Sequence, residues 1–209
     1  MLFEKMLAEK ISKRLLCSVL AGILITSSVS AYCGKIMSDI SSSVVRFHIL
    51  ANSDSEYDQQ IKLKVRDGIS EYVEGLLKDS KSAAETRKII SENLKNIEDY
   101  TDSCIKKYGC TYSAAAAFGN YKFPRREYEN ATFPGGNYNA LKIVLGEGKG
   151  HNWWCVLYPQ LCFSSSENGE LSENGYSDLQ NTLTKEEYGI ITSKDTVKFK
   201  LKILEMFSD

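Results

Sequence analysis

The sequence lacks three features that would each assign it to a common class of protein. It has no C-x-x-C motif and only two histidines, which stand apart, so no zinc site is predicted. It has no G-x-G-x-x-G motif: Gly146, Gly148 and Gly150 have G-x-G-x-G spacing before an apolar segment, which indicates a hairpin loop and not a dinucleotide site. A formal net charge of -1 provides no basic stripe for nucleic acid. Neither a cofactor nor a nucleic-acid partner is therefore predicted.

The N-terminus, in contrast, has the order of residues that is typical of a secretory signal. Three basic residues between positions 10 and 14 precede an uncharged, largely apolar run over 15–34, and small residues surround Ala31. Two interpretations stay open. Residues 1–31 are either a signal peptide cleaved after Ala31 or an uncleaved membrane anchor, because about 20 residues can span a bilayer. Both predict export, with membrane contact only through this segment.

Export changes the interpretation of the six cysteines. The body of the chain contains Cys104, Cys110, Cys155 and Cys162. In an oxidising compartment four cysteines allow three sets of pairings, and pairing between sequence neighbours predicts the disulfides Cys104–Cys110 and Cys155–Cys162. The alternative for each cysteine is a buried free thiol, because cysteine is often simply part of a core.

The body of the chain contains segments of strand pattern and segments of helix pattern. Strands are predicted where apolar residues alternate or where β-branched and aromatic residues cluster, over 43–50, 111–118, 138–145, 153–158 and 197–204.

Two long helices are predicted over 56–77 and 82–108, because apolar residues recur there at helical spacing and Gly109 suits the position after a helix end. A hydroxyl residue three positions before an acidic one begins each helix, as in a capping box. The candidate pairs are Ser53 with Glu56, Ser55 with Asp58, Ser82 with Glu85 and, for a short further helix, Thr184 with Glu187.

This order of elements predicts an α+β fold with two helices packed on one face of a mostly antiparallel sheet of about five strands. The strands at 138–145 and 153–158 are expected to form a hairpin around the glycine-rich loop. Residues 32–163 would form the core of the domain, and 164–184 a polar, flexible insert. Residues 185–209 would add a helix and a strand that complete the sheet.

Two sets of residues are candidates for catalysis, and each has a structural alternative. Cys155 with His151 or His48 would form a thiol–imidazole pair, but an apolar strand disfavours a thiolate. Asp54 and Asp58 would form a carboxylate pair, yet both lie at the start of a helix, where the helix dipole alone stabilises them. The structural interpretation is favoured for both sets.

The adjacent Trp153 and Trp154 are expected to point to opposite faces of their strand. One of them should lie in the core. For the other, three interpretations stay open: a second core position, a protein interface, or a surface on which a sugar stacks.

Three blocks of sequence carry a family resemblance. They are VRFHILANSDS at 45–55 continuing as DQQIKLKVRD at 58–67, PGGNYNAL at 134–141, and GHNWWCVLYPQLCF at 150–163. In this order they resemble the stage II sporulation protein R family of endospore-forming bacteria. Small departures from the family pattern occur at Gly136, Tyr158 and Gln160, and the pattern does not include Cys104 and Cys110.

The resemblance implies a role as a signal between cells, not as an enzyme. Family members are made in the forespore and exported across its membrane into the space that faces the mother cell. There they trigger a membrane-embedded, aspartic-type protease, which removes the pro-sequence from the mother-cell sigma factor. The implied partner of this chain is the extracellular part of that protease.

Within the matching blocks, we expect the partner to contact polar and aromatic residues that flank the predicted strands. The residues are Asn52, Asp54, Asp58, Asn152, Trp153, Trp154, Pro159 and Leu161, the last two in a loop that extends to Cys162. The alternatives are an exported hydrolase of the cell wall or of a peptide, using Cys155, His151 or the two aspartates, and a wall-binding module with an exposed tryptophan.

Overall fold

The computed structural model describes residues 2–128, 131–161 and 173–193. The chain divides into two compact units, Met1–Asp39 and Ile40–Asp209. Helix α1 covers Leu2–Ser43, and its segment Lys10–Ser43 is long and apolar enough to cross a membrane. A signal sequence has the same properties, so this helix fits both interpretations of the N-terminus.

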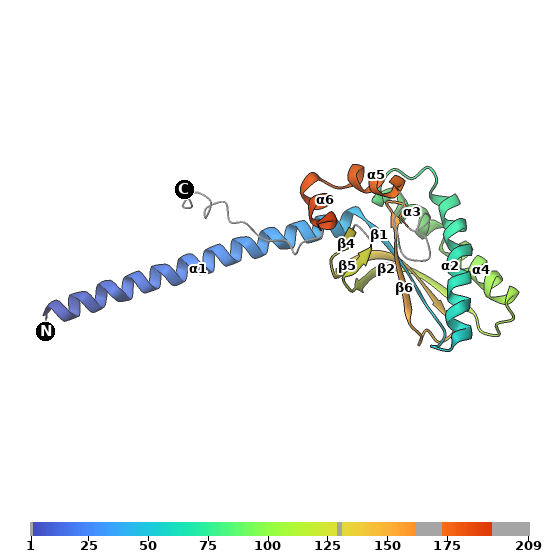
Figure 1. The fold of residues 1–209 in the computed structure, drawn as a ribbon, viewed down its shortest axis with the longest axis horizontal. Helices are drawn as coiled ribbons and strands as arrows, with labels where there is room; N and C mark the ends of the chain where they lie inside the picture. The colour runs from blue at the N-terminus through green and yellow to red at the C-terminus, as the bar shows by residue number, and fades with distance from the viewer. Residues whose placement is uncertain (1, 129–130, 162–172, 194–209) are drawn as a thin grey trace. The chain divides into compact units, whose positions relative to one another are not determined.

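The second unit is an α+β domain built around a four-stranded mixed sheet (Figure 1). Its elements in chain order are β1 (Val45–Leu50), α2 (Glu56–Leu77), α3 (Ala83–Glu92), α4 (Leu94–Lys107), β2 (Ala114–Phe123), β3 (Arg126–Tyr128), β4 (Ala131–Phe133), β5 (Gly136–Leu145), β6 (Asn152–Tyr158), α5 (Glu173–Thr182) and α6 (Lys185–Thr192). The strand order is β2-β5-β1-β6, and β3 and β4 form a separate two-stranded arm.

The sheet confirms the α+β class but differs from the prediction in detail. β1 runs parallel to β5 and antiparallel to β6, so the sheet is mixed. The predicted hairpin between β5 and β6 is wrong, because β1 lies between them. Backbone N–H groups of Lys149 and Gly150 donate to the carbonyls of Asn52 (3.2 Å) and Ala51 (3.0 Å), so the glycine-rich loop crosses the end of β1. The strand predicted at 197–204 lies outside the described residues.

The helix starts follow the predicted capping pairs. The Ser55 hydroxyl accepts from the Asp58 N–H, and the Ser82 hydroxyl accepts from the Glu85 N–H. The full capping box forms at the start of α6. A break at Asn93, however, divides the second predicted helix into α3 and α4. The Asn93 side chain donates to the Ile89 carbonyl (2.9 Å), a local bond that competes with the helical pattern.

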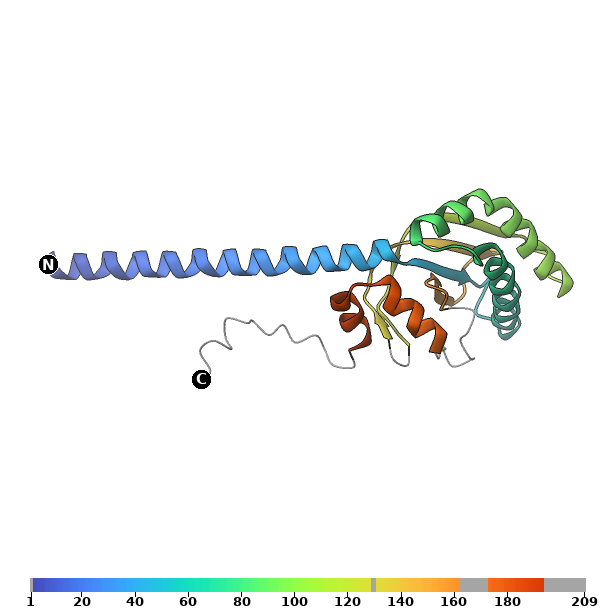
Figure 2. The same ribbon diagram turned by 90° about the horizontal axis from the view of Figure 1, so that it is seen from above.

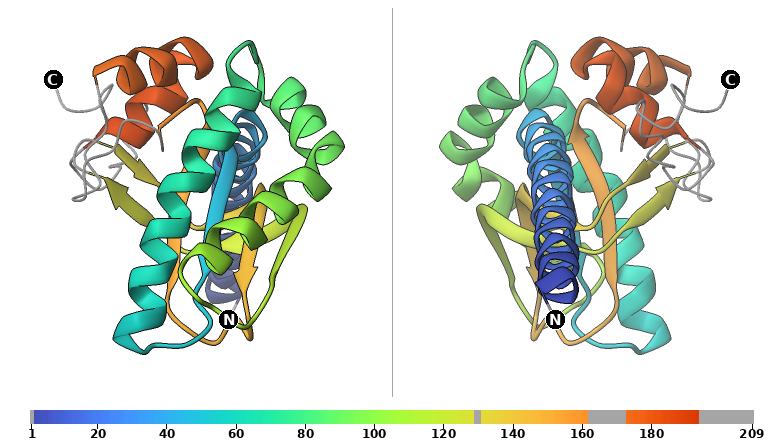
Figure 3. Two further views of the ribbon diagram at one scale, coloured as in Figure 1. Left: turned by 90° about the vertical axis from the view of Figure 1, so that its right-hand side faces the viewer. Right: turned by 90° about the vertical axis from the view of Figure 1, so that its left-hand side faces the viewer.

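Three helices, and not the predicted two, pack against one face of the sheet. Figure 3 shows α2, α3 and α4 over the strands, and Figure 2 shows α3 and α4 on the opposite side of the strands from α5 and α6. The core between helices and sheet includes the buried side chains of Phe47, Ile69, Ile90, Ile97 and Ile143. Burying an aliphatic or phenylalanine side chain contributes about 1.5–3 kcal/mol, so this layer is the main source of stability.

Part of the segment predicted to be a flexible insert is helical. Residues 173–182 form α5, in which Leu179 is fully buried, and Leu183 after it is also buried. α6 then contacts β4. Two leucines four residues apart are enough to bury one side of a short helix. The otherwise polar composition of the segment hides this helical pattern in the sequence.

Replacement of Ile69 by alanine should lower the free energy of unfolding by about 2–5 kcal/mol, because it leaves a cavity between α2 and the sheet. Leu63, which is 41% exposed on the same helix, provides the matched control. Leu63→Ala should change the stability by no more than about 0.5 kcal/mol. Urea denaturation of the purified proteins measures both, and equal losses would contradict the assigned core.

Candidate functional site

The residues predicted to contact a partner lie at opposite ends of β6. Asn152 pairs with Leu50 at the end of β1, whereas Tyr158 pairs with Val45 at its beginning. The structure therefore separates one group, Asn52, Asp54, Asp58, Asn152, Trp153 and Trp154, from a second group, Pro159 and Leu161. The seven residues of β6 put its two ends roughly 20 Å apart, so the predicted contact residues belong to two separate surfaces.

In the first group, Asp58 is a buried structural residue and not a contact residue. Only 5% of it is exposed, and its carboxylate accepts hydrogen bonds from Asn52 Nδ2 (2.9 Å), the Ser53 hydroxyl and Tyr112 Oη (2.9 Å). Burial alone would raise the pKa of Asp58, but these hydrogen bonds hold the pKa below its usual value. Asp58 thereby ties the start of α2 to the segment that follows β1.

Asn52 likewise holds the glycine-rich loop. Its Oδ1 accepts from the backbone N–H of Glu147 (2.9 Å), and its carbonyl accepts from Lys149. A Cβ atom on Gly146, whose φ is +55°, would meet Asn52 Oδ1 at 2.2 Å. The loop can therefore approach Asn52 only because glycine occupies this position.

Asp54 has a different environment, because it pairs with His151 at the start of β6. Asp54 Oδ1 accepts from the His151 backbone N–H (2.6 Å) and lies 2.5 Å from His151 Nδ1. These hydrogen bonds from His151 lower the pKa of Asp54. Beneath the pair, Lys62 Nζ donates to the His151 carbonyl (3.1 Å). Asp54 therefore positions His151 on the surface and carries a satisfied charge.

Around this pair the surface forms an open hollow of about 320 Å³. Its lining residues are Asp54, Arg126, Lys149, Gly150, His151, Asn152 and Trp154. Three of these residues, Asp54, Asn152 and Trp154, are predicted contact residues, so the structure brings part of the predicted set together. The polar, solvent-open lining suits contact with another molecule's surface.

The two tryptophans point to opposite faces of β6, as predicted. Trp153 contacts Phe47 edge-on in the helix-side core, with a centroid distance of 5.6 Å. Trp154 stacks on His48 at 4.8 Å on the other face, and the Arg126 guanidinium lies 5.5 Å from its ring. Both are half-buried, so neither tryptophan is an isolated exposed anchor.

Arg46 and His48 are central to this second face of the sheet. Arg46 is 0% exposed, and its Nε donates to the Cys155 carbonyl (2.9 Å). Its guanidinium lies 4.7–5.2 Å from the ring centroids of Phe123, Phe133 and Tyr138. Alternation along β1 identifies the two faces but does not indicate that β1 is a central strand, with both faces covered.

His48 is held as a neutral imidazole. It is 5% exposed, and burial, followed by the nearby charges of Lys142 and Arg46, lowers its pKa to about 4. Neither ring nitrogen has a hydrogen-bond partner in the part of the chain that the structure describes. Because His48 packs among aromatic rings on this face, it is not placed to activate a cysteine on the helix side.

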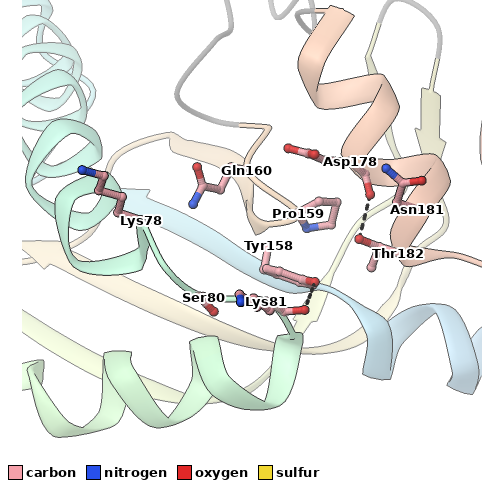
Figure 4. Close-up of a pocket in the computed structure, with 9 residues that line it drawn as sticks. All are labelled: Lys78, Ser80, Lys81, Tyr158, Pro159, Gln160, Asp178, Asn181 and Thr182. Carbon is pink, nitrogen blue, oxygen red and sulfur yellow. Dashed lines mark hydrogen bonds between the residues drawn. The ribbon is translucent and has the colours of Figure 1, made fainter.

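At the other end of β6, Pro159 lines a second hollow, of about 360 Å³ (Figure 4). Tyr158 Oη donates to the Lys81 carbonyl (2.8 Å), and Gln160 Nε2 donates to the Leu77 carbonyl (3.1 Å). Leu161 is buried. These bonds fasten the end of β6 to the turn after α2, which makes Leu161 a packing residue and leaves Pro159 in a structural turn.

The cysteines support a structural role. Cys155 is 3% exposed and disulfide-bonded, so it provides no thiolate nucleophile. Its predicted partner, Cys162, lies outside the described residues. The predicted Cys104–Cys110 disulfide is wrong, because both carry free thiols. Cys104 packs toward Gly68 of α2, whereas Cys110 Sγ lies 3.7 Å from Tyr57 Oη, so the two thiols have different neighbours.

The structure thus defines a class: an α+β domain, preceded by an apolar helix, with open polar hollows at both ends of β6. The family model of stage II sporulation protein R matches residues 41–168. The chain therefore belongs to the stage II sporulation protein R family, and membership supports a role in sporulation.

A curated relative gives the same assignment. Stage II sporulation protein R of Bacillus subtilis (strain 168) is 40% identical over 131 residues, which are 63% of this chain and 58% of the relative. The chain thus matches somewhat more than half the length of this relative. No solved structure matches the chain. The matched region contains the residues of both hollows except those contributed by α5.

Replacement of Asp58 by asparagine should lower the free energy of unfolding by about 1–3 kcal/mol at pH 7, because the new amide N–H₂ faces donors. The pKa of Asp58 is lower in the folded protein than the value of about 3.9 in an unfolded chain, so the ionised form favours folding. That stabilisation is complete above about pH 5 and is lost as the pH falls through the folded pKa.

The difference between wild type and Asp58→Asn should therefore shrink in urea denaturation at pH 3.5. Asp79→Asn, at an exposed position in the turn after α2, is the matched control and should have little effect at either pH. If the difference in unfolding free energy between wild type and Asp58→Asn does not change with pH, the proposed hydrogen-bond network around Asp58 is contradicted.

Gly150→Ala should destabilise the domain by about 1–3 kcal/mol, because its Cβ would lie 2.2 Å from the Ser53 carbonyl oxygen. Gly75→Ala is the control: nothing lies within 4 Å of a Cβ at this helical position, so the change should stabilise by about 0.5–1 kcal/mol. Thermal unfolding measures both changes. A neutral Gly150→Ala would show that the loop does not cross β1 as closely as described.

Proposed function

We propose that this chain is an exported signalling protein that activates a membrane-embedded, aspartic-type protease during sporulation. In this proposal it is made in the forespore and acts in the space that faces the mother cell. The activated protease removes the pro-sequence from the mother-cell sigma factor. The observation that carries the proposal is the family match over 41–168, which includes β1, β6 and the loop between β5 and β6.

Two structural features support this proposal. The apolar helix α1 fits a signal sequence or a membrane anchor, as export requires. In the body, Cys155 is disulfide-bonded, Asp58 is buried among donors, and Asp54 is paired with His151, so none of these residues is poised as a nucleophile or shared-proton acid. The candidates for a hydrolase thus have structural roles in the fold.

The proposed mechanism is surface complementarity. A ligand shifts a protease to its active arrangement only if it binds that arrangement better than the inactive one. A difference of about 3 kcal/mol in binding free energy would shift the equilibrium between the inactive and the active protease roughly 150-fold. The hollow beside His151 supplies exposed contact residues, Asp54 and Asn152, next to Trp154, whereas Asn52 and Asp58 hold the loops that shape it.

The test is complementation of a spore former that lacks its own stage II sporulation protein R. Wild-type chain should restore processing of the sigma-factor precursor on an immunoblot. The double variant Asp54→Ala/Asn152→Ala should reduce processing at least tenfold at equal exported levels, because it removes contact groups at the hollow. Lys106→Ala, at an exposed position on α4, is the control and should process normally.

Cys155→Ala separates signalling from thiol catalysis. Loss of a disulfide typically costs about 2–5 kcal/mol, so the exported amount should fall. Processing per exported molecule should stay at the wild-type level. Complete loss of precursor processing by Cys155→Ala protein that is folded and exported would contradict the proposal. A failure of the wild-type chain to restore any processing would contradict it as well.

A further inference from the structure

The sheet face opposite α2–α4 carries a transverse row of aromatic side chains with a cation at each end. His48 on β1 is in register with Lys142 on β5 and with Trp154 on β6. Because residues in register on neighbouring strands point to the same face, these three side chains form a line across the sheet. Arg126 of β3 extends the line, with its guanidinium 5.5 Å from the Trp154 ring. We call Lys142, His48, Trp154 and Arg126 the cation–aromatic row.

Part of this face is covered and part of it is open. The β3–β4 arm closes one half over Arg46, because Tyr128 and Phe133 contact the guanidinium. In the other half, Lys142 and Trp154 are half-buried and Ala115 is exposed. His48 itself is covered, because Trp154 stacks on it and Tyr121 and Phe123 of β2 contact its ring. The rest of the row, exposed Arg126 with half-buried Lys142 and Trp154, is a surface at which another molecule can dock.

The cations of the row form no ion pair with the described residues. Lys142 Nζ lies 5.4 Å from the Tyr121 ring centroid, and Arg126 lies over Trp154, but neither forms an ion pair within the described part of the chain. The neighbouring carboxylates have other partners: Glu127 pairs with Arg125, Glu147 pairs with Lys149, and Asp54 is hydrogen-bonded to His151. The row therefore carries two positive charges that a partner's carboxylates can pair with.

A buried cation lies next to the row and strengthens this charge. Arg46 is two residues before His48 on the same face of β1, and it is fully buried. Among the described residues its Nη1 has no hydrogen-bond partner, and its hydrogen bonds go to the Cys155 carbonyl and the Tyr128 hydroxyl. Low-dielectric surroundings screen such a charge less than water does, so its field reaches the surface above.

The shape beside Lys142 favours side chains over a strand as the docking group. Ala117 is the register partner of Lys142 on β2, and Ala115 lies on the same face, so small residues leave a shallow floor there. The outer edge of β2 is partly occupied: Asp102 and Glu98 of α4 accept from the backbone N–H groups of Ala114 (2.6 Å) and Ala116 (3.0 Å). These carboxylates block the addition of a strand at this part of the edge.

From this geometry we infer that the cation–aromatic row is a docking surface for an acidic segment of a partner protein. Carboxylates of the segment pair with Lys142 and Arg126, and its apolar groups cover Trp154 and the alanine floor. Lys142 and Trp154 are two strands apart, which puts their backbones roughly 10 Å from each other, and Arg126 lies against the Trp154 ring. The identification of the partner as the sigma-factor-processing protease rests on the proposed function. The acidic character of the docking segment is inferred from the row alone.

The test uses a coupling reagent that joins an amine directly to a carboxylate, applied to sporulating cells that carry the full chain. Wild type should give a product in which Lys142 is linked to an Asp or Glu of the partner, identified by mass spectrometry. Lys142→Arg keeps the charge but removes the reactive amine, so this variant should lose the product and keep sigma-factor processing. The double variant Lys142→Glu/Arg126→Glu should lose the product and reduce processing at least tenfold, since like charges would meet.

The matched control reverses two exposed lysines on the helix side, Lys106→Glu/Lys107→Glu, and should leave both readouts unchanged. Equal exported amounts and equal melting temperatures show that each variant folds. Normal processing by the row-reversed variant would overturn the inference, and so would a Lys142 product with a second copy of this chain. A third result would also overturn the inference: wild type binds phosphatidylglycerol vesicles, the double variant Lys142→Glu/Arg126→Glu does not, and no cross-linked protein product forms. The row would then bind lipid.

The two proposals fail separately. A Lys142 product with a protein other than the protease would support the docking surface and contradict the proposed function. Restored processing without a Lys142 product, and without an effect of charge reversal, would support the proposed function and contradict the docking surface.

Discussion

The arrangement of this domain depends on the burial of both faces of β1. Phe47 and Ile49 enter the core beneath α2, while Arg46 and His48 lie on the opposite face. A buried guanidinium is costly unless its charge is compensated, and here compensation comes from three aromatic rings, the Cys155 carbonyl and the Tyr128 hydroxyl. The β3–β4 arm therefore stabilises the central strand, because it supplies Tyr128 and Phe133 to the Arg46 guanidinium. The arm also sets the boundary between the covered and the open half of the second sheet face.

The surface features follow from that boundary. Trp154 covers His48 at the place where the arm ends, and Arg126 of the arm reaches back over Trp154. The pKa of His48 is about 4, so the imidazole is neutral at ordinary pH and the exposed charge of the row comes from lysine and arginine. The hollow beside His151 adjoins the row because Trp154 contributes to both. Both features therefore form one continuous region at the end of the sheet where β1 ends and β6 begins.

Local signals in the sequence predicted local structure well. Capping pairs located the starts of α2, α3 and α6, because a side chain that binds a backbone N–H three residues later needs no tertiary context. Topology could not be obtained in this way: alternation shows which residues share a face but not that β1 separates β5 from β6. Of the site, the family blocks located Asp54, Asn152 and Trp154. Lys142 and Arg126 were missed, because each is an isolated cation whose importance comes only from its neighbours across the sheet.

A rigid sheet is a suitable support for a signalling surface. Strand register fixes the backbone beneath the row, and ring stacking holds His48 and Trp154, so these groups have little conformational freedom to lose when a partner docks. The glycine-rich loop is fastened to the end of β1 by Asn52, and α2 is fastened to the same segment by Asp58, so the hollow keeps its shape without a ligand. A preformed surface of this kind can favour one arrangement of a flexible partner over another, because the partner must adapt to the sheet and not the reverse. The polar side chains that resemble catalytic residues in the sequence therefore have a structural role, which is to keep this surface in place.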